Sequence, residues 1–293
     1  MEILLAPYSG FCFGVKRAIQ IALEAANKPP VFTTGPLIHN PQMVQELEKK
    51  GIKVMENPDE LHNSTVIIRS HGITKQENEI LLRNGNTIID ATCPFVAKAH
   101  EYAQRLTQEH YPILILGDHT HPEVEALLSY CDGETIVISS PKELPEFQWQ
   151  RLGVISQTTM DLASLREVIN ALIPCVKELR LFNTICTATS QRQEATVALA
   201  KKCDLMIVIG GHNSSNTRML TKLSSEITPT LQIETAAELK PEVIMGKQRI
   251  GISAGASTPD YLIVQVFNRI KEITGDRTTV KSVEDIPVNK EES

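Results

Sequence analysis

Short apolar runs rich in Val, Ile and Leu recur along this chain of 293 residues, and longer amphipathic stretches separate them. Such runs lack the alternation of a strand with one solvated face, so both faces of each strand must be covered, as in parallel sheets packed between helices. The sequence therefore predicts an α/β fold with mostly parallel sheets. The predicted strands are 2–7, 30–35, 65–70, 86–91, 112–117, 134–139, 152–156, 181–185, 205–210, 230–235 and 249–253.

The amphipathic stretches predict helices at 14–26, 41–50, 74–84, 94–109, 122–130, 160–172, 189–202, 215–225 and 259–273. A formal charge of −6 and a pI near 5.8 argue against a nucleic-acid binder, which needs clustered Lys and Arg. The first residues do not resemble a secretion signal, and no apolar run approaches the roughly 18 residues of a membrane span. We expect a cytoplasmic protein that does not bind membranes.

Three of the predicted strands end in the same way, with a cysteine just ahead of a helical stretch. These cysteines are Cys12, Cys93 and Cys186, about 80 and 90 residues apart. A lone cysteine is often a buried thiol that only fills space. The repeated placement favours a second interpretation, an internal threefold repeat that brings one thiol per repeat to the carboxyl ends of the strands, where ligands of parallel sheets bind.

Each repeat also supplies two polar residues after buried strands. One set follows a strand and a glycine, and consists of His39, His121 and Ser215; the other ends the next buried strand, and consists of His71, Thr158 and Ser257. The segment 212–218, His-Asn-Ser-Ser-Asn-Thr-Arg, adds Ser214 and Asn216 at a predicted helix start, where free backbone N–H groups favour anions. Ordinary helix caps or solvated loop side chains explain each of these residues taken singly.

Three thiolates can bind three irons of a 4Fe-4S cluster and leave the fourth iron open to a substrate oxygen. A structural zinc in a phosphate-binding module, or a scaffold without metal, is the alternative. The other cysteines, Cys131, Cys175 and Cys203, do not end strands in this way, and we expect them to be packing or surface thiols.

Glu123 follows His121 and Pro122 in the first turn of a predicted helix. An acidic residue there commonly stabilises the helix dipole. The alternative is a proton donor close to a metal-bound hydroxyl, with the Thr158 hydroxyl completing a short relay. The spacing does not distinguish these two interpretations.

Several motifs together resemble the LytB/IspH family of 4-hydroxy-3-methylbut-2-enyl diphosphate reductases along nearly the whole chain. The motifs are GFCFGVKRA, TGPLIHNPQ, RSHG, DATCP, GDHTHPEV, SQTT, NTICTATSQRQEA, GGHNSSNT and SAGAST. The resemblance implies three pseudo-repeated α/β lobes around a central iron-sulfur cluster. Their bounds would be 13–93, 94–186, and 187–293 together with 1–12.

The resemblance also implies the roles of the site residues. Cys12, Cys93 and Cys186 would bind a 4Fe-4S cluster with one open iron. The catalytic residues would be Glu123, Thr158 and His121, with Glu123 donating a proton and Thr158 ordering the substrate hydroxyl. The diphosphate would be held by His39, His71, Ser214, Ser215, Asn216 and Ser257, with His121 lining the same pocket.

The family reaction is the reductive dehydroxylation of 4-hydroxy-3-methylbut-2-enyl diphosphate to isopentenyl and dimethylallyl diphosphate, the last step of the methylerythritol phosphate route to isoprenoids. A ferredoxin or flavodoxin would deliver the electrons. Because such donors are acidic, the resemblance implies a basic docking patch. The sequence offers Lys16, Arg17, Lys201 and Lys202 for it.

Overall fold

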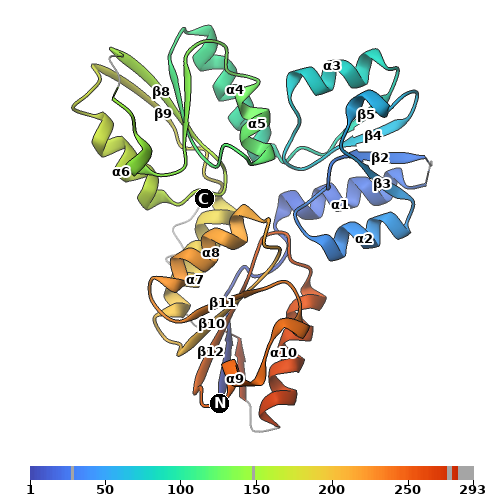
Figure 1. The fold of residues 1–293 in the computed structure, drawn as a ribbon, viewed down its shortest axis with the longest axis vertical. Helices are drawn as coiled ribbons and strands as arrows, with labels where there is room; N and C mark the ends of the chain where they lie inside the picture. The colour runs from blue at the N-terminus through green and yellow to red at the C-terminus, as the bar shows by residue number, and fades with distance from the viewer. Residues whose placement is uncertain (28–29, 147–148, 276–278, 283–293) are drawn as a thin grey trace. The chain divides into compact units, whose positions relative to one another are not determined.

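The computed structural model describes residues 1–27, 30–146, 149–275 and 279–282, and its strands form three parallel sheets (Figure 1). The chain divides into two compact units. We call residues 14–38 and 42–186 the central unit. The terminal unit comprises Met1–Phe13, His39–Pro41 and the described residues from Thr187 onward. The α/β class with parallel sheets is confirmed, whereas the bounds of the three predicted lobes stay a prediction.

The central unit contains two four-stranded sheets. The first has the order β3 (Ile52–Met55), β2 (Val31–Thr34), β4 (Thr65–Ile68), β5 (Thr87–Asp90). The second has the order β7 (Thr135–Ile138), β6 (Ile113–Leu116), β8 (Arg151–Ser156), β9 (Glu178–Phe182). The helices along this part of the chain are α1 (Phe13–Ala25), α2 (Pro41–Lys49), α3 (Lys75–Arg83), α4 (Pro94–Gln108), α5 (Pro122–Leu128) and α6 (Leu162–Leu172).

The sheet of the terminal unit has the same strand order, except that its fourth strand comes from the start of the chain and a fifth strand follows it. It runs β11 (Thr230–Ile233), β10 (Leu205–Ile209), β12 (Arg249–Ala254), β1 (Glu2–Leu5), β13 (Thr279–Ser282). The first strand of the chain thus occupies the position that β5 and β9 hold in the other sheets, with Ile3 paired to Ile250. The predicted threefold repeat, with the N-terminal strand completing the third unit of the pattern, agrees with this topology.

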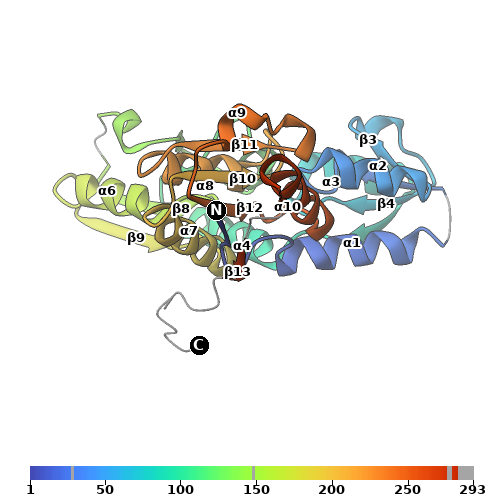
Figure 2. The ribbon, with the colours of Figure 1, turned by 90° about the horizontal axis from the view of Figure 1, so that it is seen from below.

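The strand β10 of the terminal sheet is buried on both faces. Leu205, Ile207 and Ile209 pack with α10 (Asp260–Thr274), while Met206 packs on the other side against Leu199 of α7 (Thr187–Ala200). Figures 1 and 2 both place β10 and β12 between α7 and α10. The unit also contains α8 (Ser215–Ser225) and the short α9 (Pro241–Ile244). The continuous apolar run predicted this double burial because neither face of such a strand is suited to water.

Three strand predictions need correction. The strands β3 and β13 were not predicted, and the strand predicted at 181–185 lies at Glu178–Phe182. In the first case the cause is an edge position, since Lys53 and half-buried neighbours give β3 no apolar run. At the end of β9 the chain leaves the sheet because the Thr184 hydroxyl group bonds to the backbone of Ser156. Residues 283–293 of the third predicted lobe lie outside the described residues.

No helix within the described residues combines the length and the apolar character that crossing a membrane requires.

Replacing Ile115 with alanine tests how much the double burial stabilises the second central sheet. Ile115 has no exposed surface and packs against Leu106 and Val124. We expect the free energy of unfolding to fall by about 2–5 kcal/mol, because a buried side chain leaves a cavity. Urea titration followed by circular dichroism measures the change. Ile173→Ala is the control, since Ile173 is 61% exposed. A similar loss of unfolding free energy in both variants would contradict the conclusion that burial of Ile115 stabilises the sheet.

Candidate functional site

The three predicted cysteines occupy equivalent places in the fold. Cys12 follows β1 and directly precedes α1, Cys93 follows β5 and is the N-cap residue of α4, and Cys186 follows β9 and directly precedes α7. The strands β1, β5 and β9 hold the same position in their sheets. All three cysteines are partly buried. Each is therefore a thiol at the carboxyl edge of a parallel sheet, as the sequence predicted.

One backbone hydrogen bond recurs at each of these cysteines. The N–H groups of Cys12, Cys93 and Cys186 donate to the carbonyl oxygens of Ala256, Ser70 and Thr158, at 3.0, 3.0 and 3.1 Å respectively. The three acceptors lie in the turns after β12, β4 and β8, which also hold equivalent positions in their sheets. An equivalent hydrogen bond thus positions the backbone of each cysteine, so the threefold repeat is present in the site residues as well as in the strand order.

The remaining cysteines lie in different surroundings. Burial raises the pKa of the Cys131 thiol to about 12 and that of the Cys203 thiol to about 11, which disfavours the thiolate form that binds metals. Cys175, in the turn after α6, is exposed, and its thiol donates to the Ala171 carbonyl in the last turn of that helix. These observations agree with the prediction that all three are packing or surface thiols.

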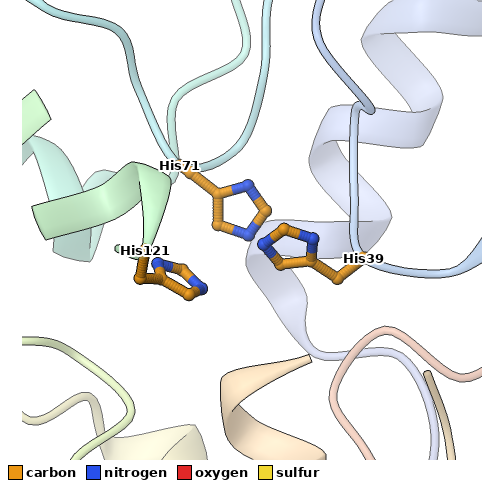
Figure 3. A group of neighbouring side chains, drawn as sticks. All are labelled: His39, His71 and His121. Atoms are coloured by element: carbon orange, nitrogen blue, oxygen red, sulfur yellow. The ribbon is translucent and has the colours of Figure 1, made fainter. Parts of the chain in front are cut away.

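Two predicted histidines lie together in the central unit. The rings of His71, in the turn after β4, and His121, in the loop after β6, meet edge to face with their centroids 5.3 Å apart (Figure 3). His121 is the N-cap residue of α5, and its Nδ1 accepts a hydrogen bond from the Glu123 N–H at 3.1 Å. This bond requires Nδ1 to be unprotonated, so Nε2 is the ring atom that carries the proton in neutral His121.

Glu123 is almost fully buried, with 2% of its surface exposed. Its two carboxyl oxygens accept hydrogen bonds from Thr158, one from the backbone N–H at 2.7 Å and one from the hydroxyl group at 2.9 Å. Burial raises the pKa of Glu123 to about 7, although both hydrogen bonds act in the opposite direction. A carboxyl group with this pKa holds a proton near neutral pH and can donate it, which favours the proton-donor interpretation over a simple helix-dipole role.

The terminal unit holds the other predicted polar residues. The Ser257 hydroxyl donates to the His39 carbonyl at 3.0 Å, and Ser214 caps α8 by accepting the Thr217 N–H. Asn216, in the first turn of α8, is 4% exposed, and neither atom of its amide group has a hydrogen-bond partner among the described residues. Since buried amides are almost always paired, Asn216 indicates a place for a ligand rather than a plain cap.

The site residues fall into two sets according to the unit that holds them. The central unit positions Cys93, Cys186, His71, His121, Glu123 and Thr158, and the terminal unit positions Cys12, His39, Ser214, Ser215, Asn216 and Ser257. Ser215 begins α8. Each of these residues lies in the loop after a strand or in the first turn of the helix that follows, and Glu123, Ser215 and Asn216 are the ones in first turns.

Several residues that support the site were not predicted. The Gln157 amide oxygen, fully buried, accepts the Asp118 N–H at 3.0 Å and so braces the loop that leads to His121. Arg17, expected in a docking patch, instead donates to the Thr92 carbonyl, one residue before Cys93. Both lie inside the quoted motifs, but the partners are 39 and 75 residues away, so no local pattern could identify the contacts.

Known proteins resemble the chain over nearly its whole length. The model of the LytB protein family matches residues 3–271. The 4-hydroxy-3-methylbut-2-enyl diphosphate reductase of Geobacter sulfurreducens is 48% identical over 275 residues, covering 93% of this chain and 98% of its own. The reductase of the same name from Aquifex aeolicus is 45% identical over 280 residues, which are 93% of this chain and 97% of its own.

Two solved structures resemble the chain as well. A reductase described as the terminal enzyme of the non-mevalonate pathway is 44% identical, with a TM-score of 0.65, and covers 92% of this chain and 99% of its own. The Plasmodium falciparum E-1-hydroxy-2-methyl-but-2-enyl-4-diphosphate reductase is 27% identical, with a TM-score of 0.87, and covers 100% of this chain and 95% of its own. The chain therefore belongs to the LytB family, and this membership implies an iron-sulfur cluster.

Proposed function

We propose that this chain is a 4-hydroxy-3-methylbut-2-enyl diphosphate reductase, the terminal enzyme of the non-mevalonate route to isoprenoids. The observation that carries the proposal is the identity of about 45% with such reductases over nearly the full length of both chains. In the reaction, the substrate takes up two electrons and two protons, loses its allylic hydroxyl group as water, and yields isopentenyl or dimethylallyl diphosphate. The buried acid Glu123 beside Thr158 supports this chemistry, because the leaving hydroxyl group must be protonated.

The cofactor in this proposal is a 4Fe-4S cluster bound by Cys12, Cys93 and Cys186. These cysteines fit such a cluster, because all three are partly buried and the backbone N–H of each makes the same kind of hydrogen bond. By contrast, burial raises the pKa of two of the other cysteines, so they stay protonated. When bound, the cluster supplies electrons one at a time and an iron without a protein ligand. The protein binds and orients the substrate, excludes water and delivers the proton.

The diphosphate group is the part of the substrate that the polar loops would hold, through His39, His71, Ser214, Ser215, Asn216 and Ser257, with His121 lining the same pocket. Imidazole, hydroxyl and amide groups all donate hydrogen bonds to phosphate oxygens. Ser215 and Asn216 lie in the first turn of α8, whose N–H groups favour an anion. The buried Asn216 amide, which has no hydrogen-bond partner among the described residues, supports this assignment most directly.

Replacing Asn216 with alanine should therefore weaken substrate binding more than it slows turnover. We expect KM to rise about tenfold, equivalent to the roughly 1.4 kcal/mol of one hydrogen bond to a charged group, with kcat changed less than threefold. Steady-state kinetics with the allylic diphosphate measures both constants. Asn213→Ala in the same loop is the control. An Asn216→Ala enzyme with unchanged KM would rule out this contact.

Glu123 is the proton donor in the proposed mechanism. Its proton can pass directly to the substrate hydroxyl group or through the Thr158 hydroxyl, which both donates and accepts hydrogen bonds. The Thr158 carbonyl also anchors Cys186. Thr158 thus connects the proton donor to a proposed cluster ligand through its side chain and its backbone.

The electron donor is proposed to be a ferredoxin or flavodoxin. Lys16, Lys201 and Lys202 are exposed and can attract an acidic partner, whereas Arg17 is half-buried and braces the Thr92 carbonyl. We also propose a cytoplasmic location, because widely spaced thiols that serve as metal ligands require a reducing compartment.

Anaerobic purification followed by iron and acid-labile sulfide analysis tests the proposal, together with an assay of the allylic diphosphate and a chemically reduced dye. We expect a brown protein with about four iron and four sulfide per chain, since a 4Fe-4S cluster contains four of each. Its colour should bleach in oxygen, and it should release the two isoprenoid diphosphates. A colourless, air-stable protein that holds zinc and no sulfide would instead identify a binding module with a structural metal.

A further inference from the structure

Arg192 is a buried cation in the second turn of α7, with 5% of its surface exposed. One terminal nitrogen, Nη1, donates to the Ala188 carbonyl at 2.9 Å in the first turn of the same helix. The other, Nη2, donates to the Gly10 carbonyl at 2.7 Å, a residue 182 positions away in the chain. A buried guanidinium is costly unless its donors are used, so these bonds fix the side chain between the two segments.

Both segments lead directly to proposed cluster ligands. Gly10 lies two residues before Cys12, and α7 begins at Thr187, the residue that follows Cys186. Gly10 has φ of +96°, and a Cβ there would lie 2.6 Å from the Asp260 carboxyl oxygen. Only glycine fits this turn, which presents its carbonyl oxygen to Arg192.

The face of α7 that carries Arg192 also contacts the strand β12. One turn beyond Arg192, the Thr196 hydroxyl lies 2.7 Å from the Ser253 hydroxyl in β12. The turn after β12 contains Ala256, whose carbonyl oxygen accepts the Cys12 N–H. The helix α7 thus supports the Cys12 segment in two ways. Arg192 binds the Gly10 carbonyl directly, and Thr196 contacts the strand that leads to Ala256, the hydrogen-bond partner of Cys12.

We propose that Arg192 is a positioning residue for the cysteine ligands of the iron-sulfur centre, an inference that rests on the proposed function. It joins the Cys12 turn to the first turn of α7, the helix that directly follows Cys186 in the chain, and its charge lies beside the segment that carries a thiolate. Neither lysine nor glutamine can replace it fully. Lysine keeps the charge but lacks the planar fork that reaches two carbonyl oxygens, and glutamine lacks the charge.

The experiment compares Arg192→Lys and Arg192→Gln with the wild type and with Glu194→Gln, a control at an exposed position of the same helix. Each protein is purified anaerobically, and its iron and sulfide content, its rate of cluster loss under a chelator and its midpoint potential are measured. We expect cluster loss to be about tenfold faster in both Arg192 variants, in line with the 10–100-fold effects of residues that orient metal ligands. Arg192→Gln should also have a lower midpoint potential, because a nearby positive charge favours the reduced centre.

Wild-type iron content and rate of cluster loss in both variants would overturn the inference, whatever the potential. If Arg192→Gln fails to fold by circular dichroism, Arg192→Lys decides the question, because it keeps a buried charge of the same sign. A wild-type protein without iron and sulfide would refute the proposed function itself. A wild-type cluster combined with unaffected variants would refute only the role of Arg192.

Discussion

Glu123→Gln is expected to lower kcat by about 10²–10⁴-fold, the usual contribution of a general acid. The glutamine amide cannot donate its proton to a leaving hydroxyl group, but its oxygen can still accept the Thr158 N–H and its NH₂ group can donate to the Thr158 hydroxyl. The side chains should therefore keep their positions while the variant loses the proton transfer. Single-turnover assays with a chemically reduced enzyme measure this step without the electron donor.

The pH dependence of the wild-type enzyme provides a second measurement of the same residue. Because the pKa of Glu123 is raised to about 7, the protonated form is lost as the pH rises through 7, and kcat should decline above that pH. The raised pKa also means that the folded state holds a proton that the unfolded state releases near its ordinary value of 4.5. Its stabilising contribution is present in full below pH 4.5 and lost as the pH rises through 7.

The glutamine variant should not share this loss, since its side chain stays neutral. We therefore expect its thermal unfolding temperature at pH 8 to equal or exceed that of the wild type. Glu125→Gln, on the same helix, is the matched control and should change neither property. If Glu123→Gln kept wild-type turnover, or if it unfolded at a lower temperature at pH 8, the assignment of a buried neutral acid would be wrong.

Cys93→Ser is expected to abolish measurable turnover and to strip most of the iron from the protein. Serine keeps the backbone N–H bond to the Ser70 carbonyl but replaces the proposed thiolate ligand with a hydroxyl group. Loss of residues that merely orient metal ligands costs 10–100-fold, so loss of a ligand should exceed about 100-fold. The thermal unfolding temperature of the anaerobic protein should also fall, because a bound centre stabilises only the folded chain.

The matched control for this prediction is Cys175→Ser. Cys175 is an exposed thiol three residues beyond the end of α6, and its Sγ donates a weak hydrogen bond to the Ala171 carbonyl. Iron content, sulfide content and turnover should equal those of the wild type. Equal iron in Cys93→Ser and wild type would exclude Cys93 as a ligand, and a loss in both variants would indicate general damage to the thiols.

Much of the fold could be predicted because its signals are local. The buried strands β6, β10 and β12 are continuous apolar runs, and the helices α2, α4 and α8 differ from their predicted bounds by at most one residue. The strand β3 could not be predicted, because an edge strand with Lys53 on one face has no such run. Its pairing with β2 depends on where the chain returns after α2.

The class of the fold, the parallel sheets and the placement of Cys12, Cys93 and Cys186 at strand ends could all be predicted, because periodicity and residue order are properties of neighbouring residues. The burial of Glu123 beside Thr158 and the contact of Arg192 with Gly10 could not be predicted, since they join residues 35 and 182 positions apart. Desolvation explains the difference. The pKa of a carboxyl group and the hydrogen bonds of a guanidinium depend on which groups exclude water from them, and here those groups belong to distant segments of the chain.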